Sequence, residues 1–252
     1  AKTDRVDLAI LDFTEAISRD SSYTLSFFER GFINTLNRNY DEAIQDFDIV
    51  NQLNPEWAKS TIVFEAFHNR GIERIQKKTY HKAVEDFNRA IEINPDYLNA
   101  YLNRGRAYKN LKKNSIALKD FNYIIETNPK FKEAFYQRAM IHYGRRNYVK
   151  AEQDLQSALT LDPGDKDLHF KLGESYFYSG KYSKAIQQFD SVIKIDNRDL
   201  WAYYRKGFSH KSLRQSKLAI RAFEVFLDLA PKQHRRQILS VKTEIKKLKK
   251  QI

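Results

Sequence analysis

Residues 98–131 of this 252-residue chain read LNAYLNRGRAYKNLKKNSIALKDFNYIIETNPKF, and this stretch decides the fold. Apolar and aromatic residues recur at helical spacing over residues 97–110, and the same spacing returns over residues 116–125. The polar stretch Lys112-Lys113-Asn114 interrupts the pattern between them. Asn128-Pro129 ends the second segment, because the residue before a proline is disfavoured in the helical conformation. The stretch therefore predicts two antiparallel helices joined by a short turn.

The same pattern recurs along the chain with a period of 34 residues. A small residue marks the first helix of each unit, at Gly31, Gly71, Gly105, Ala139, Gly173 and Gly207. An alanine marks the second helix, at Ala43, Ala83, Ala117, Ala151, Ala185 and Ala219, and a large residue follows four positions later, at Phe47, Phe87, Phe121, Leu155, Phe189 and Phe223. These columns define six units: 24–57, 64–97, 98–131, 132–165, 166–199 and 200–233. Neither helix of a unit can bury its apolar face alone, so we expect neighbouring units to stack.

With these columns the chain resembles the tetratricopeptide repeat (TPR) family. The glycine and alanine columns, the Ala-x-x-x-Phe pairs, Tyr108, Tyr176 and the terminal Asn-Pro or Asp-Pro pairs carry the resemblance, which covers residues 24–231. It implies an all-α fold, a right-handed superhelical solenoid of stacked antiparallel helix pairs. The first helix of each unit would line its concave side.

The two ends of the chain extend the pattern. Ala9, Phe13 and Ala16 repeat the second-helix spacing, so residues 1–23 are predicted to be a half repeat that lacks its first helix, and we expect the natural protein to extend further toward the N-terminus. In residues 234–252 an apolar stripe on an otherwise basic helix predicts a cap on the last unit; its members are Ile238, Val241, Ile245, Leu248 and Ile252.

Six extra residues, 58–63, separate the first two units. They either lengthen the following helix by about one and a half turns or form a loop. Trp57, Ile62 and Val63 favour the helix, which would then project past its neighbours as a contact ridge.

Composition excludes several classes of protein. The chain has 44 Lys and Arg against 32 Asp and Glu and no Cys, which rules out disulfides and thiolate chemistry. It contains no apolar segment long enough to span a membrane and no signal peptide. Phosphate-binding loops and hydrolase motifs are absent, and the six histidines lack metal-ligand spacing. We therefore expect a protein that is not an enzyme and binds no cofactor or metal. The compartment stays open, with the cytoplasm slightly favoured.

Four arginines stand just before the small residue of the first four units: Arg30, Arg70, Arg104 and Arg138. An aspartate follows each of them sixteen residues later, at Asp46, Asp86, Asp120 and Asp154. In the last two units both residues are replaced together. This pairing predicts a structural ion pair between the two helices of one unit rather than an anion-binding ladder.

The resemblance also implies which first-helix residues face the groove. The candidates for peptide binding are Phe28, His68, Asn69, Asn103, Arg106, Tyr136, Gln137, Met140, Tyr143, Phe170, Lys171, Phe177, Tyr204 and Arg205. Asn69, Asn103 and Gln137 share one position in successive units, where side-chain amides could hold a peptide backbone. Packing between units is the alternative role for Phe28 and Phe170.

The groove also argues against one known function of the family. Units that clamp the C-terminal carboxylate of chaperones use Lys at the fifth and Asn at the ninth position, and neither occurs here. The sequence therefore predicts a protein-interaction scaffold that binds an extended peptide or a helix of a protein partner. The alternative is a binder of an anionic surface, nucleic acid or acidic lipid, through the basic C-terminal helix and the basic turns at Arg38, Lys77, Lys78, Lys112, Lys113, Arg145, Arg146, Lys181 and Arg214. Self-association is a third alternative.

Overall fold

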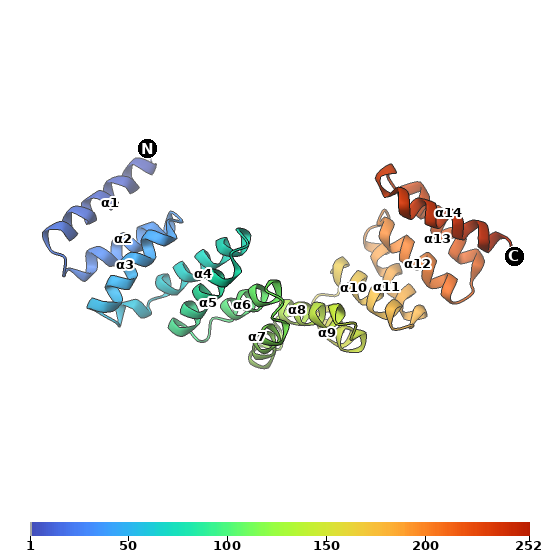
Figure 1. Cartoon of the computed structure of the whole chain (residues 1–252), viewed down its shortest axis with the longest axis horizontal. Helices are drawn as coiled ribbons and strands as arrows, with labels where there is room; N and C mark the ends of the chain where they lie inside the picture. The colour runs from blue at the N-terminus through green and yellow to red at the C-terminus, as the bar shows by residue number, and fades with distance from the viewer. Residues whose placement is uncertain (1) are drawn as a thin grey trace. The chain divides into compact units, whose positions relative to one another are not determined.

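The computed structural model describes residues 2–252, with side chains from Arg5 onward. Over these residues the secondary structure consists of fourteen α-helices and two short 3-10 helices, without a strand (Figure 1). The prediction of an all-α repeat fold is confirmed. The helices form two compact units, an N-terminal unit of residues 1–126 and a C-terminal unit of residues 127–252.

The N-terminal unit begins with a single helix, which three helix pairs follow. Its elements are α1 (Lys2–Arg19), α2 (Thr24–Leu36), α3 (Tyr40–Leu53), η1 (Trp57–Lys59), α4 (Thr61–Gln76), α5 (Tyr80–Ile93), α6 (Leu98–Asn110) and α7 (Asn114–Thr127), whose last residue crosses the boundary. Within this unit each second helix packs against the first helix of the next pair, α3 against α4 and α5 against α6.

The C-terminal unit holds three helix pairs and a final helix. Its elements are α8 (Lys132–Gly144), α9 (Tyr148–Leu161), α10 (Lys166–Tyr178), α11 (Tyr182–Ile195), α12 (Leu200–Ser212), α13 (Ser216–Leu229), η2 (Lys232–His234) and α14 (Arg235–Lys249). As in the other unit, α9 packs against α10 and α11 against α12, so the pairs stack in sequence order.

Local sequence sets where the helices end. After α3 and α5 the chain turns extended at Asn54 (φ −149°) and Asn94 (φ −132°), each of which precedes a proline. The turn inside each pair needs one residue in the left-handed region. That residue is Gly180 in one pair and a basic residue in the other five, Arg38, Lys78, Lys112, Arg146 and Arg214, with φ between 58° and 66°.

Close packing of the small and large columns holds each pair together. A Cβ atom on Gly71 or Gly173 would lie 2.7 Å from the ring of Phe87 or Phe189, so only glycine lets the helices approach this closely. In the fourth repeat the column holds Ala139, and the residue facing it is Leu155; both are fully buried. A slightly larger residue on one helix is thus matched by a smaller one on the other, which keeps the packing dense.

The first helix and the six extra residues depart from the regular repeat. Ala9, Phe13 and Ala16 on α1 are only half-buried, whereas Phe47, in the corresponding position of the next repeat, is 1% exposed. The extra residues form η1 and three added residues of α4, which has 16 residues against 13 in α2. The prediction of a helix longer by one and a half turns is therefore wrong. Val63 is 2% exposed within the core, so the added turn forms no projecting ridge.

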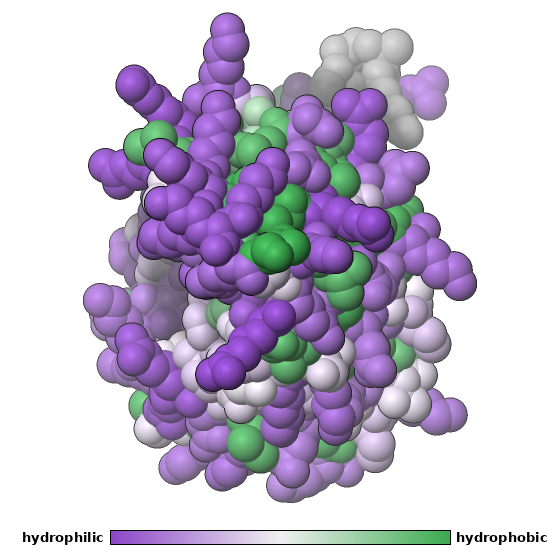
Figure 2. Space-filling view, turned by 90° about the vertical axis from the view of Figure 1, so that its right-hand side faces the viewer, coloured by the Kyte–Doolittle hydropathy of each residue, from purple (hydrophilic) through white to green (hydrophobic). Residues whose placement is uncertain are grey.

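The last helix covers the final pair. Val241 and Leu248 of α14 are buried against α13, with Ile238 and Ile245 packed beside them. Ile252 lies beyond the end of the helix and is 62% exposed, so its predicted place in the apolar stripe is wrong. Figure 2 shows the face at the C-terminal end, where hydrophilic side chains predominate and hydrophobic residues form small separate areas.

Candidate functional site

Three successive first helices of the C-terminal unit, α8, α10 and α12, present aromatic side chains. They are half-buried, which leaves ring surface accessible, and belong to Tyr136, Tyr143, Phe170, Phe177 and Tyr204. Met140 is half-buried on the same helix as Tyr136 and Tyr143. Half-buried aromatic rings on adjacent helices are suited to bind an apolar segment of a partner.

A buried carboxylate lies among these rings. Glu174 on α10 is 6% exposed, and its Oε1 accepts hydrogen bonds from Arg205 Nη2 at 2.6 Å and Nε at 3.1 Å. Its Oε2 accepts a hydrogen bond from Lys171 Nζ at 2.9 Å. Two of the three groove cations predicted from the sequence, Lys171 and Arg205, therefore share one internal carboxylate, and the triad carries a net charge of +1.

Both cations also contact aromatic rings. Lys171 Nζ lies 5.7 Å from the centre of the Tyr143 ring, and the guanidinium of Arg205 lies 5.3 Å from the centre of the Tyr178 ring. Arg205 Nη2 also donates to the Tyr178 hydroxyl at 3.0 Å. Burial raises the pKa of Tyr143 above its usual range. These contacts fix the orientation of the rings, and burial keeps the Tyr143 phenol neutral at physiological pH.

A small hollow of about 170 Å³ lies at the other end of the same helices. It is lined by Lys132, Glu133, Tyr136, Asp165, Asp167 and Leu168. Lys132 Nζ contacts Asp162 at 2.8 Å and Asp165 at 3.0 Å. The hollow thus has a mixed polar lining that could accept a polar group of a ligand next to the ring of Tyr136.

The predicted groove residues of the N-terminal unit form a tighter arrangement. His68 is 6% exposed; Asn103 Nδ2 donates to its Nε2 at 3.0 Å, and the Tyr97 hydroxyl lies 3.5 Å from its Nδ1. Because an amide nitrogen only donates, Nε2 accepts and Nδ1 carries the proton. Burial lowers the pKa of His68, so the ring is neutral at physiological pH.

The amide side chains differ from one another in accessibility. Asn69 is half-buried, but Asn103 and Gln137 are only 9% and 6% exposed. Gln137 Nε2 donates to Glu133 Oε1 at 2.6 Å, and Arg106 Nη1 donates weakly to Asn103 Oδ1 at 3.4 Å. The expected row of free amides is therefore reduced, because polar neighbours already occupy two of the three.

Two further predicted groove residues of the N-terminal unit, Phe28 and Arg106, differ in how exposed they are. The ring of Phe28 packs edge-on against Trp57 at 5.5 Å and also touches Phe47, so it joins the core around η1. Arg106 is exposed on α6. Phe28 is thus half-buried against the core, and Arg106 is the more accessible of the two.

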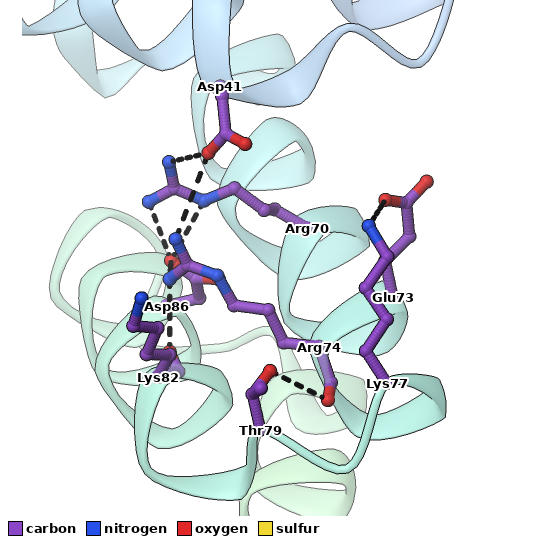
Figure 3. Close-up of polar contacts among 8 residues, drawn as sticks. All are labelled: Asp41, Arg70, Glu73, Arg74, Lys77, Thr79, Lys82 and Asp86. Carbon is purple, nitrogen blue, oxygen red and sulfur yellow. Dashed lines mark hydrogen bonds and ion pairs between the residues drawn. The ribbon is translucent and has the colours of Figure 1, made fainter.

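The four arginine and aspartate pairs are present in the structure. Arg30, Arg104 and Arg138 each make two-pronged contacts with their aspartates, with closest distances of 2.6 to 2.7 Å. Figure 3 shows the remaining pair, in which Arg70 lies between Asp86 of its own repeat and Asp41 of the preceding one, both at 2.8 Å. Arg74 also reaches Asp86 at 2.8 Å. These arginines are occupied within the fold and are not a site for an external anion.

Two residues of this site, Glu174 and Tyr178, were not among the binding candidates predicted from the sequence. Glu174 lies one residue after the small-residue column, and Tyr178 is the last of three aromatics in a row. The signal for Glu174 was its place between Lys171 and Arg205 in the repeat register.

Within the part of the chain that the structure describes, there is no cluster of His, Asp and Glu able to hold a metal ion, and no helix there could cross a membrane.

Three family profiles match the sequence. A TPR repeat profile matches residues 71–112, a tetratricopeptide repeat profile matches 102–166, and a profile of YpiA-like tetratricopeptide repeats matches 149–197. The chain is a tetratricopeptide repeat protein. The predicted resemblance is thereby confirmed. No protein of curated function matches this TPR sequence.

Solved TPR structures share the fold. The C-terminal part of a TPR repeat-containing protein from Cytophaga hutchinsonii is 16% identical, with a TM-score of 0.69 over 88% of this chain and 92% of that one. MamA is 20% identical, with a TM-score of 0.62 over 68% and 94% of the two chains. YrrB, described as a TPR protein with an unusual peptide-binding site, is 20% identical, with a TM-score of 0.60 over 77% and 97%. At these identities the likeness establishes the fold alone.

Proposed function

We propose that the chain is a protein-interaction scaffold, and that the first-helix face of its C-terminal unit binds an extended peptide segment of a partner. The observation that carries the proposal is the group of half-buried aromatic rings on α8, α10 and α12 around the Lys171–Glu174–Arg205 triad. The peptide-binding site named for the similarly folded YrrB is consistent with it.

The triad indicates which peptides fit. Because Glu174 already neutralises one of the two cations, an acidic tail gains little there and must compete with an internal carboxylate. The rings of Tyr136 and Phe177 remain as apolar contacts, and ligand carbonyls can accept from the outer N–H groups of Arg205. We therefore expect ligands with apolar or aromatic anchors and little net charge.

A display library of natural peptide segments tests this proposal. We expect the wild-type chain to select peptides with apolar anchors that bind at both low and moderate salt. Tyr136→Ala with Phe177→Ala should weaken these peptides by at least about tenfold, since aromatic anchors dominate such interfaces. Leu239→Ala, on the exposed face of α14, is the matched control and should bind as the wild type does.

Two results would overturn the proposal. One is equal binding by the double variant, provided that its circular dichroism is that of the wild type. The other is a selection that returns only acidic peptides whose binding is lost with added salt, which would assign the interaction to basic surfaces outside the groove.

A further inference from the structure

The turns inside the three helix pairs of the C-terminal unit are strongly basic. Residues 141–152, 175–186 and 209–220 together contain eight Lys or Arg and a single acidic residue, Glu152. Glu152 is 5% exposed and already paired with Lys181 at 2.5 Å. We call these three segments, with the last turn of α14, the turn edge.

Contacts between successive turns place them on one side of the unit. Tyr148 stacks on Tyr178 with ring centres 5.4 Å apart, and the Ser179 hydroxyl donates to Glu152 at 2.5 Å, which joins the first two turns. The third turn meets the end of α14 across a hollow of about 540 Å³, where Glu244 pairs with Lys211 and Lys247. The hollow is lined by Lys211, Arg214, Ser216, Glu244, Lys247, Leu248 and Gln251. Because the helix pairs stack in sequence order, the three turns follow one another along one side of the unit.

Four of its cations have no side-chain partner within the described chain. Among the described residues, the side chains of Arg146, Lys150, Arg214 and Lys217 form no hydrogen bond or ion pair. Arg146 and Arg214 have φ of 58°, a region where glycine is the residue without strain. A cation after a first helix gains from that helix's dipole, but Lys150 and Lys217 lie in the first turn of α9 and α13, where the dipole opposes a positive charge.

Exposed aliphatic side chains accompany these cations. Val149, next to Lys150, is 55% exposed, and Leu218, next to Lys217, is 43% exposed. In the N-terminal unit, taken by itself, Leu36 near Arg38 is 64% exposed and Ile116 near Lys113 is 41% exposed. Aliphatic groups between cations suit the boundary between lipid headgroups and acyl chains. Single-stranded nucleic acids recruit aromatic rings instead, and the rings of Tyr148 and Tyr182 here are packed against other aromatics.

We propose that the turn edge of the C-terminal unit docks on the surface of an anionic lipid bilayer. The cations contact the acidic headgroups, and Val149 and Leu218 enter the interfacial layer. The proposal is independent of peptide binding on the first-helix face, which lies on different residues.

Sedimentation with vesicles tests the proposal, using phosphatidylcholine vesicles with and without 30% phosphatidylserine. We expect binding only to the acidic vesicles, with affinity falling as salt is added. A turn variant, Arg146→Gly with Lys150→Glu, Arg214→Gly and Lys217→Glu, should lose at least about tenfold in affinity, because each cation near an acidic surface contributes to binding. Its melting temperature should equal or exceed that of the wild type.

The matched control carries the same change in net charge on the opposite end of the unit: Lys130→Glu, Lys194→Glu and Arg198→Glu. It should retain at least half of the wild-type binding. Val149→Ser with Leu218→Ser should weaken vesicle binding about tenfold and leave binding to a double-stranded RNA unchanged.

Three outcomes would overturn the proposal. The first is equal loss in the control, which would make net charge the cause. The second is full binding by the serine variant, and the third is tighter binding to the RNA than to the acidic vesicles. The last result would assign the turn edge to nucleic acid.

Discussion

The two ends of the helix pairs in the C-terminal unit use charge in different ways. At the loops between repeats, residues 128–133, 161–168 and 195–200 hold six acidic and four basic residues. Lys132 pairs with Asp162 and Asp165, and Lys166 with Asp196 at 2.8 Å and Asp199 at 3.3 Å. The three turn segments of the turn edge hold eight cations, and Arg146 and Lys150 are among those whose side chains have no partner within the described chain.

The role of a charged side chain in a repeat protein therefore depends on whether it has a partner within the fold. Loop aspartates cap helices and pair with lysines, so their charge contributes to folding. The unpaired cations of the turn edge make no such contacts, and they remain accessible to an external anion. Each of the following tests compares the two ends.

The largest expected effect on the free energy of unfolding comes from removing the side chain of Asp165. Its Oδ1 accepts hydrogen bonds from the backbone N–H groups of Asp167 and Leu168 at 3.0 and 3.1 Å, which caps α10. Asp165→Ala should lower the free energy of unfolding by about 1 to 2 kcal/mol, measured by urea denaturation. Arg146→Ala, on the turn edge, should change it by less than about 0.5 kcal/mol. Similar losses in the two variants would remove the distinction.

A second comparison replaces one lysine by glutamate at each end of the helix pairs, and we expect the two variants to change in stability in opposite directions. Asn147 Oδ1 accepts from the backbone N–H of Lys150 at 3.3 Å, so Lys150→Glu completes a capping box and matches the dipole of α9. The Lys150→Glu variant should have a higher melting temperature than the wild type, because its free energy of unfolding rises by about 0.5 kcal/mol. Lys194→Glu, in the last turn of α11, should lower it by a similar amount. A lower melting temperature for Lys150→Glu would show that this lysine stabilises the fold.

The smallest effect is a dependence on alkaline pH. Hydrogen bonds from Lys132 to Asp162 and Asp165 raise the pKa of this lysine from 10.5 to about 12. Its contribution to stability is therefore complete below pH 10.5 and is lost as the pH rises toward 12. Urea denaturation should show a constant difference between wild type and Lys132→Met up to pH 10.5 and a shrinking one above it. A difference that persists at pH 12 would contradict the pairing.

The repeat fold was predictable because its signals lie within one unit. Gly71 and Phe87, or Arg70 and Asp86, are sixteen residues apart in the same helix pair, and the period repeats the pair. The six extra residues were harder to predict, because the backbone is extended at Ser60 (ψ 156°), between the 3-10 turn and the start of α4 at Thr61. Helical spacing alone does not distinguish that arrangement from one longer helix.

The candidate site was less predictable because its contacts join different units of the repeat. Arg205 binds a carboxylate 31 residues earlier, and Asn103 meets a histidine 35 residues earlier. Register places such residues on one face but does not say which of them satisfy one another. For this reason Lys171 and Asn103 were predicted to be accessible to a ligand, whereas in the structure both have internal partners.

The most direct test of the different roles of charge is the melting temperature as a function of salt. The wild type is compared with Lys150→Gln, Arg214→Gln and Lys217→Gln combined, between 10 mM and about 0.3 M NaCl, where screening shortens from about 30 Å to less than 8 Å. Because these cations repel one another without partners, the variant should melt higher than the wild type at low salt. The gap should close as salt is added. A variant that melts lower at low salt would show that the turn cations stabilise the fold and would contradict the account.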